Sequence, residues 1–103
     1  MQNNKASYRY ALALFSLAKE KNLQDSVLTD CKFILSEFNK TIELFAIIKN
    51  PTVNKEVKKN IFIKIFAQNI QSITMDFISL LLQKGREPIL PTILEKYNQL
   101  YNK

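Results

Sequence analysis

Lysine side chains gather in one short stretch of this sequence and form its densest group of chemically active residues. Lys55, Lys58, Lys59 and Lys64 follow one another closely, and the whole chain has a formal net charge of +6. A lysine-rich helix can follow a phosphate backbone. The stretch has no arginine, however, and arginine is the better residue for bidentate contacts to phosphates and bases. We therefore expect these lysines to form a solvated helix face that does not bind nucleic acid. A basic helical nucleic-acid-binding module remains the alternative function.

The side chains that most often perform catalysis or hold metal ions are scarce. The chain has no histidine and one cysteine, Cys31, so it lacks the commonest general base and a plausible zinc ligand set. Its nine carboxylates show no spacing that would couple two of them, and we expect solvated surface charges. Cys31 should pack as a small hydrophobe, and the single glycine, Gly85, cannot build a phosphate loop. No enzymatic activity, cofactor or metal is expected.

The elements that carry these residues are predicted to be helices. The chain has 103 residues, which is enough for one domain with its own core. One glycine and three prolines leave few tight turns. The sequence has no run of eighteen apolar residues that could span a bilayer. The predicted fold class is all-α: a compact six-helix bundle in a single domain.

The helix boundaries follow from capping residues and prolines. We expect Ser7, Thr41 and Ser72 to cap the N-termini of the first, third and fifth helices, Asn54 to open the fourth, and Gly85 to follow the end of the fifth. The predicted segments are 7–22, 25–38, 41–49, 54–68, 72–84, and a last helix that begins between Pro88 and Pro91 and continues through Tyr101.

The first and fifth helices carry more apolar surface than one packing face needs. At about 100° per residue, the apolar residues of each cover an arc from about 300° round to about 160°, whereas an ordinary surface helix has a stripe of about 100°. In the first helix these residues are Ala6, Tyr8, Tyr10, Ala11, Ala13, Leu14, Phe15, Leu17 and Ala18, and in the fifth they are Ile73, Met75, Phe77, Ile78, Leu80, Leu81 and Leu82. The second and last helices are apolar on one face only.

Two explanations of this surplus stay open from the pattern alone. Both helices could be central in the bundle and enclosed by their neighbours. Alternatively, they could lie side by side and offer a shared groove to an amphipathic helix from another chain.

Three further motifs bear on this choice. The stretch "YALALFSLAKE" (Tyr10 to Glu20) opens the chain, "KNP" (Lys49 to Pro51) separates the third and fourth helices, and "KGR" (Lys84 to Arg86) precedes "LPTILEKYNQLY". In type, order and spacing the chain resembles the delta subunit of bacterial F-type ATP synthases, the equivalent of the mitochondrial oligomycin-sensitivity-conferring protein. Pro88 and Pro91 follow the KGR element more closely than is usual in that family.

The resemblance implies a non-catalytic part of the stator of a proton-translocating ATP synthase. Residues 1–103 would be the N-terminal helical domain, a fragment without the C-terminal domain that engages the peripheral-stalk subunit b. The domain would bind the N-terminal helix of an alpha subunit, link the catalytic head to the stalk against rotor torque, and lie peripherally on the cytoplasmic face of the bacterial cell membrane. The expected contacts with the alpha subunit are Tyr10, Ala13, Leu14, Leu17, Phe77, Ile78, Leu81 and Leu82.

Overall fold

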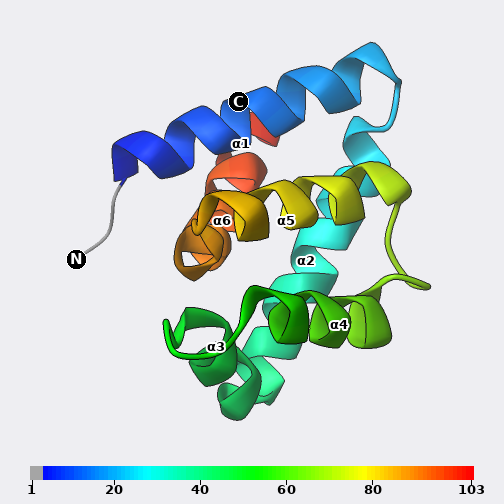
Figure 1. Cartoon of the computed structure of the whole chain (residues 1–103). Coiled ribbons are helices and arrows are strands. Elements are labelled where there is room, and N and C mark those ends of the chain that lie inside the picture. Colours follow the sequence, from blue (N-terminus) through cyan, green and yellow to red (C-terminus); the bar gives the residue numbers. More distant parts are fainter. Residues whose placement is uncertain (1–3) are drawn as a thin grey trace.

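The computed structural model describes residues 4–103, which form six α-helices, one short 3-10 helix and no strand. The helices are α1 (Asn4–Glu20), α2 (Gln24–Lys40), α3 (Ile42–Lys49), α4 (Lys55–Phe66), α5 (Ser72–Lys84), the 3-10 helix η1 (Glu87–Ile89) and α6 (Leu90–Tyr101) (Figure 1). The all-α class and the six predicted helices are confirmed. None of these helices has the length and apolar content that a membrane crossing requires.

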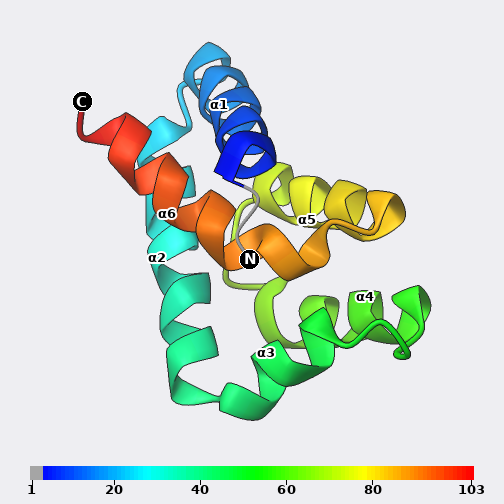
Figure 2. The same ribbon diagram turned by 90° about the vertical axis from the view of Figure 1, so that its left-hand side faces the viewer.

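Helix α5 lies between α1 and α4, an arrangement that both ribbon views show (Figures 1 and 2). Helix α1 packs mainly against α6, while α5 packs against α4, η1 and α2. The chain passes along α1 and α5 in opposite directions, so the N-terminal half of α1 lies beside the C-terminal end of α5 (Figure 1). The two helices with surplus apolar surface are therefore neighbours.

The core is built from one cluster of apolar side chains shared by all six α-helices. Four phenylalanines join α2 to α4: Phe33 meets Phe66 edge to face with ring centroids 5.8 Å apart, and Phe38 contacts both Phe62 and Phe66 at 6.4 Å. Fully burying such a side chain stabilises the fold by about 1.5–3 kcal/mol. This cluster fixes α4, and through it the position of α5.

Two helix ends follow the local signals in the sequence. The Asn54 side chain accepts a hydrogen bond from the backbone N–H of Glu56 at 2.6 Å and caps α4. Gly85 has φ +69°, a left-handed conformation that glycine adopts at little cost, and the N–H of Arg86 then reaches back to the carbonyl of Leu81 at 2.8 Å. The expectations for Asn54 and Gly85 are confirmed.

The other three expected caps are not formed, and at α5 a tertiary contact replaces the local one. Helix α1 already begins at Asn4, so Ser7 lies inside it and is buried. Thr41 precedes α3 but its side chain makes no capping hydrogen bond, and Ser72 is the first residue within α5. At the start of α5, the Asp30 carboxylate of α2 accepts from the backbone N–H of Gln71 at 2.9 Å and from the Thr74 hydroxyl at 2.7 Å.

The expectation that all carboxylates and the lysines of α4 are solvated is wrong for three residues. Lys58 is only 2% exposed, and its ammonium donates to the Glu87 carboxylate at 2.6 Å. Asp30 is also buried. Helix α4 turns the Lys58 position toward η1, where Glu87 supplies the charge that makes burial of an ammonium tolerable. A helical wheel of α4 alone does not contain that partner.

Candidate functional site: an apolar groove between α1 and α5

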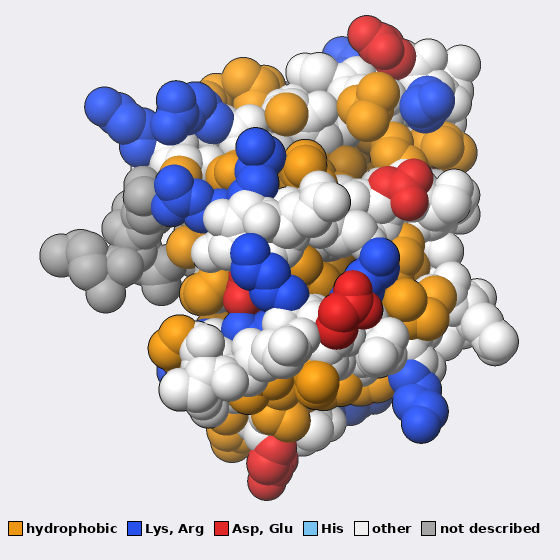
Figure 3. All heavy atoms as spheres, viewed as in Figure 1, with side chains coloured by type: hydrophobic (Ala, Val, Ile, Leu, Met, Phe, Trp, Pro, Cys, Tyr) orange, Lys and Arg blue, Asp and Glu red, His pale blue; other side chains and the backbone are white. Residues whose placement is uncertain are grey.

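An open groove of about 580 Å³ runs between α1 and α5. One wall is the face of α1, the other is the neighbouring face of α5, and the turn after α1 closes one end. The rings of Tyr10 and Phe77 meet edge to face across it, with centroids 6.3 Å apart. Figure 3 shows hydrophobic side chains gathered along α1 and between α1 and α5 on this face of the molecule. The lining residues are Tyr10, Ala13, Leu14, Leu17, Lys21, Leu23, Ser72, Ile73, Asp76, Phe77 and Leu80.

Five of the eight residues predicted to bind a partner line this groove. They are Tyr10, Ala13, Leu14, Leu17 and Phe77. Leu17 is 42% exposed, whereas Leu14 is 2% exposed and forms part of the floor. Such exposure of a large apolar side chain is a cost in water unless another surface covers it.

The other three predicted residues point away from the groove. Ile78, Leu81 and Leu82 of α5 are buried in the core cluster. The surplus apolar arc of α5 is therefore divided, since one part faces the groove and the other part packs inward against α2, α4 and η1. Enclosure within the bundle therefore explains the inward part of the arc, while the other part lines a groove that α5 shares with α1.

Several lining residues were missing from the predicted set. Leu80, which is 40% exposed, and Ile73 belong to the apolar arc of α5, at the edge next to the polar residue Asp76. Both lie next to Phe77 on the helical wheel, so the position of Phe77 was the available signal. Leu23 lies in the turn after α1, where a helical wheel gives no information.

Metal ligands and the Cys31 thiol are the side chains to consider for chemistry outside the groove. No group of three or more His, Cys, Asp or Glu side chains in residues 4–103 could hold a metal ion. Burial raises the pKa of the Cys31 thiol from 9.0 to about 12, and the nearby Asp30 carboxylate adds to the rise. A thiol that stays protonated is a poor nucleophile, so Cys31 packs as the small hydrophobe expected from the sequence.

The lysines of α4 do not form one continuous basic face. Lys58 is buried with Glu87, and the Lys55 ammonium donates to the backbone carbonyl of Gln83 at 3.1 Å. Lys59 and Lys64 remain exposed. Lys55 and Lys59 line one hollow together with the acidic residues Glu56 and Asp76, which weakens the alternative of a nucleic-acid-binding helix.

Fold and groove together define a small all-α domain that carries an open apolar groove between two antiparallel helices. Residues 6–103 match the family described as ATP synthase delta (OSCP) subunit. The ATP synthase subunit delta of Flavobacterium psychrophilum is 34% identical over 102 residues, which cover 99% of this chain and 57% of the relative. That of Chlorobaculum parvum is 37% identical over 95 residues, covering 92% and 52%, and the chloroplastic subunit of Cyanidium caldarium is 34% identical over 101 residues, covering 97% and 55%.

The chain belongs to the ATP synthase delta (OSCP) subunit family. It spans little more than half the length of the curated relatives it matches.

Proposed function

We propose that this chain is the N-terminal domain of a delta subunit, and acts as a non-catalytic stator component of an F-type ATP synthase. Its groove between α1 and α5 binds the N-terminal helix of an alpha subunit. The observation that carries the proposal is the open apolar groove in a chain of this family. An amphipathic helix that docks its apolar side chains into such a groove is a common mode of recognition.

The groove suits a joint that must stay closed under load. A rotating shaft drags the catalytic head with it unless a stator holds the head, so the joint needs slow dissociation more than rapid association. Apolar anchors such as Leu17 and Phe77 contribute in a way that added salt screens little. Subunit b contacts the part of the delta subunit that the relatives have in addition to the residues matched by this chain. The assembly lies peripherally on the cytoplasmic face of the membrane.

Titration with a peptide copying the alpha subunit's N-terminal segment tests the proposal. We expect tight binding with a negative heat-capacity change and little dependence on salt, because the contact buries apolar surface. Leu17→Asp places a carboxylate in the groove and should weaken binding at least about thirtyfold, the loss typical of a strong anchor. Calorimetry gives the affinity and the heat-capacity change.

Ile63→Asp is the matched control, since Ile63 is 43% exposed on α4, away from the groove. It should bind the peptide as the unchanged chain does. Circular dichroism checks that both variants fold. The absence of binding at tens of micromolar by the unchanged chain, or equal binding by a folded Leu17→Asp variant, contradicts the proposal.

A further inference from the structure

A smaller hollow of about 280 Å³ continues the groove past the N-terminal half of α1. It shares Tyr10 and Ala13 with the main groove, and its other lining residues are Ala6, Arg9 and Arg86. The apolar floor therefore ends between two arginine side chains. Arg9 comes from α1, and Arg86 comes from the turn that follows α5.

These two residues are the only arginines in the sequence. The other thirteen of its fifteen basic residues are lysines. Arg9 and Arg86 are far apart in the chain, yet the antiparallel arrangement of α1 and α5 brings both to one hollow. Arginine differs from lysine in its planar guanidinium, which can hold a carboxylate with two parallel hydrogen bonds.

Neither arginine has a carboxylate partner among the described residues. The ion pairs within residues 4–103 join Lys40 to Glu37 and Lys58 to Glu87. Glu87 follows Arg86 directly but is buried and bonded to Lys58. Both arginines are exposed. The hollow has no acidic lining residue, so its positive charge is not balanced locally.

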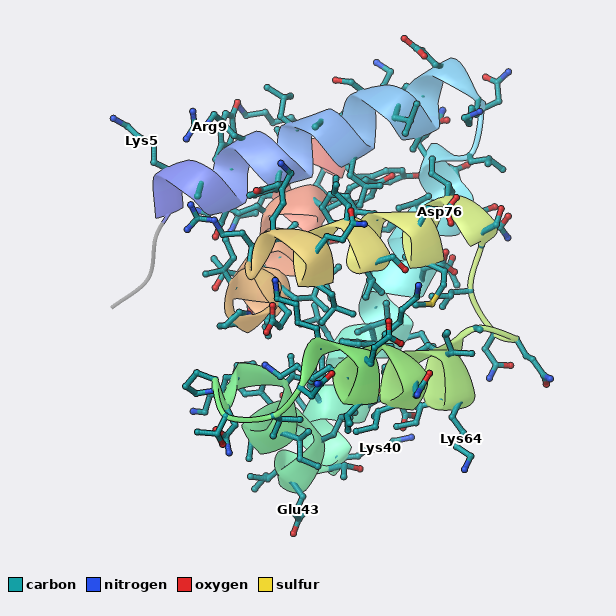
Figure 4. The ribbon with its side chains drawn as sticks, viewed as in Figure 1. Lys5, Arg9, Lys40, Glu43, Lys64 and Asp76 are labelled. Atoms are coloured by element: carbon teal, nitrogen blue, oxygen red, sulfur yellow. The ribbon has the colours of Figure 1, made fainter. Side chains whose placement is uncertain are left out.

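The opposite end of the groove is close to neutral. Its charged lining residues are Lys21 and Asp76, which carry opposite charges. Figure 4 shows Arg9, with Lys5 nearby, at one end of α1 and Asp76 at the far end of α5. The groove is thus apolar along its length and positively charged at one end only.

We propose that the helix bound in this groove carries an acidic side chain at the end that lies over Arg9 and Arg86. This inference rests on the proposed function, because it specifies the partner of the same groove. The apolar floor supplies most of the affinity, while the carboxylate fixes which end of the partner helix lies at which end of the groove. A partner docked in the reverse direction places its carboxylate at the end with Lys21 and Asp76, whose charges offset each other, and loses the arginine contacts.

The test is a coupling measurement between the chain and the alpha subunit's N-terminal peptide. Each Asp and Glu of the peptide is changed in turn to Asn or Gln, and its affinity is measured for the unchanged chain and for Arg9→Gln/Arg86→Gln. We expect one such peptide to bind the unchanged chain several-fold more weakly, and to bind the double variant with no further loss. The loss should shrink from about 50 mM to about 500 mM salt, because exposed ion pairs are screened.

Lys32→Gln/Lys64→Gln is the matched control, since both lysines are exposed and lie outside the groove and its extension. It removes the same net charge and should leave the affinity and the coupling unchanged. Arg9→Lys/Arg86→Lys keeps the charge but removes the planar group, and should bind with an intermediate affinity. Circular dichroism verifies the folding of each variant.

Three results would overturn the inference. The first is equal binding by the unchanged chain and by Arg9→Gln/Arg86→Gln. The second is an equal loss of affinity in the lysine control, which would mean that net charge alone, and not the position of the arginines, weakens binding. The third is the lack of coupling to any peptide carboxylate. If Leu17→Asp abolishes binding while the arginine variants do not weaken it, the proposed function stands and this inference alone fails; if the unchanged chain does not bind, both fail.

Discussion

The two flanks of α5 differ in what fills the space beside them. Toward α1 lies the apolar groove of about 580 Å³, and toward α4 lies a hollow of about 420 Å³ lined mostly by polar residues, including Lys55, Lys59 and Gln83. Asp76 and Leu80 line both and form the ridge between them. The volumes are similar, so the kind of side chain, and not the size of the space, separates a candidate docking surface from an ordinary solvated depression.

Polar groups on the flank toward α4 already make contacts, which leave little for a partner to satisfy. Lys55 donates to the carbonyl of Gln83, and Lys58 forms its buried ion pair with Glu87. Toward α1, the Tyr10 and Phe77 rings meet at a single edge, while Leu17 and Leu80 stay near 40% exposed. Polar groups that are paired or hydrated have a small free-energy gain from a new contact, whereas exposed apolar area has a large one.

The largest expected effect separates the core part of α5 from the ridge. Leu81 is fully buried and Leu80 is 40% exposed. Leu81→Asp should destabilise the fold by at least about 4 kcal/mol, because it leaves a cavity and an unpaired buried carboxylate. Leu80→Asp should change the free energy of unfolding by less than about 0.5 kcal/mol. Urea unfolding followed by circular dichroism measures both, and similar losses would show that the division of α5 is wrong.

A smaller but substantial effect is expected at the flank of α5 toward α4. Lys58→Ala leaves the buried Glu87 carboxylate without its partner and should cost about 3–5 kcal/mol. Lys59→Ala, at the next and exposed position, should cost less than about 0.5 kcal/mol.

Replacing both partners tests the cause of that loss. Lys58→Met/Glu87→Leu removes both charges and should recover most of the stability lost in Lys58→Ala. A double variant as unstable as the single one would mean that packing of the lysine stem, and not the charge of Glu87, explains the loss. Thermal unfolding of the three variants decides the question.

The smallest expected effect concerns Cys31, which is buried on α2. Burial raises the pKa of its thiol to about 12 in the folded chain, against 9.0 for a free thiol. Above pH 9 the unfolded chain loses this proton while the folded chain keeps it, so stability present below pH 9 is lost as the pH rises toward 12. The slope is about 1 kcal/mol per pH unit.

Cys31→Ala removes this titration and serves as the comparison. Between pH 9 and pH 10 its free energy of unfolding should fall less steeply than that of the unchanged chain. The phenols of Tyr97 and Tyr101 also have a raised pKa, Tyr97 mainly through burial and Tyr101 mainly through its hydrogen bond to Asp25. Their unperturbed pKa is 10.0, so they contribute mainly above the pH range of this comparison, and equally in both chains. Equal slopes would indicate that the Cys31 thiol is hydrated in the folded chain.

The parts of the fold that could be predicted are those decided within a few residues. Asn54 and Gly85 act through their own backbone neighbours, and the prolines and apolar periodicity place all six helices. Whether Ser7 and Ser72 cap their helices could not be predicted from their sequence neighbours alone. The start of α5 is held by Asp30, which lies more than forty residues earlier in the chain.

The groove was predictable as a pair of helices but only in part as a set of residues. On the wheel, the groove uses the part of the α1 arc from about 300° to about 40° and the part of the α5 arc from about 300° to about 0°, and the core uses most of the rest. Ala13, Leu17, Phe77 and Leu80 fall in the first part, and Ile78 in the second. A wheel gives the angle between side chains of one helix, but the direction of the core depends on where α2, α4 and α6 lie. The burial of Lys58 has the same origin, since Glu87 belongs to another element.

The two walls of the groove are held by different parts of the core. Helix α1 makes its main contacts with α6, whereas α5 rests on α4, η1 and α2. The aromatic pair Tyr10 and Phe77 is the ring contact that links the walls. The width of the groove therefore depends on how α6 is placed relative to α4, η1 and α2 within the shared core.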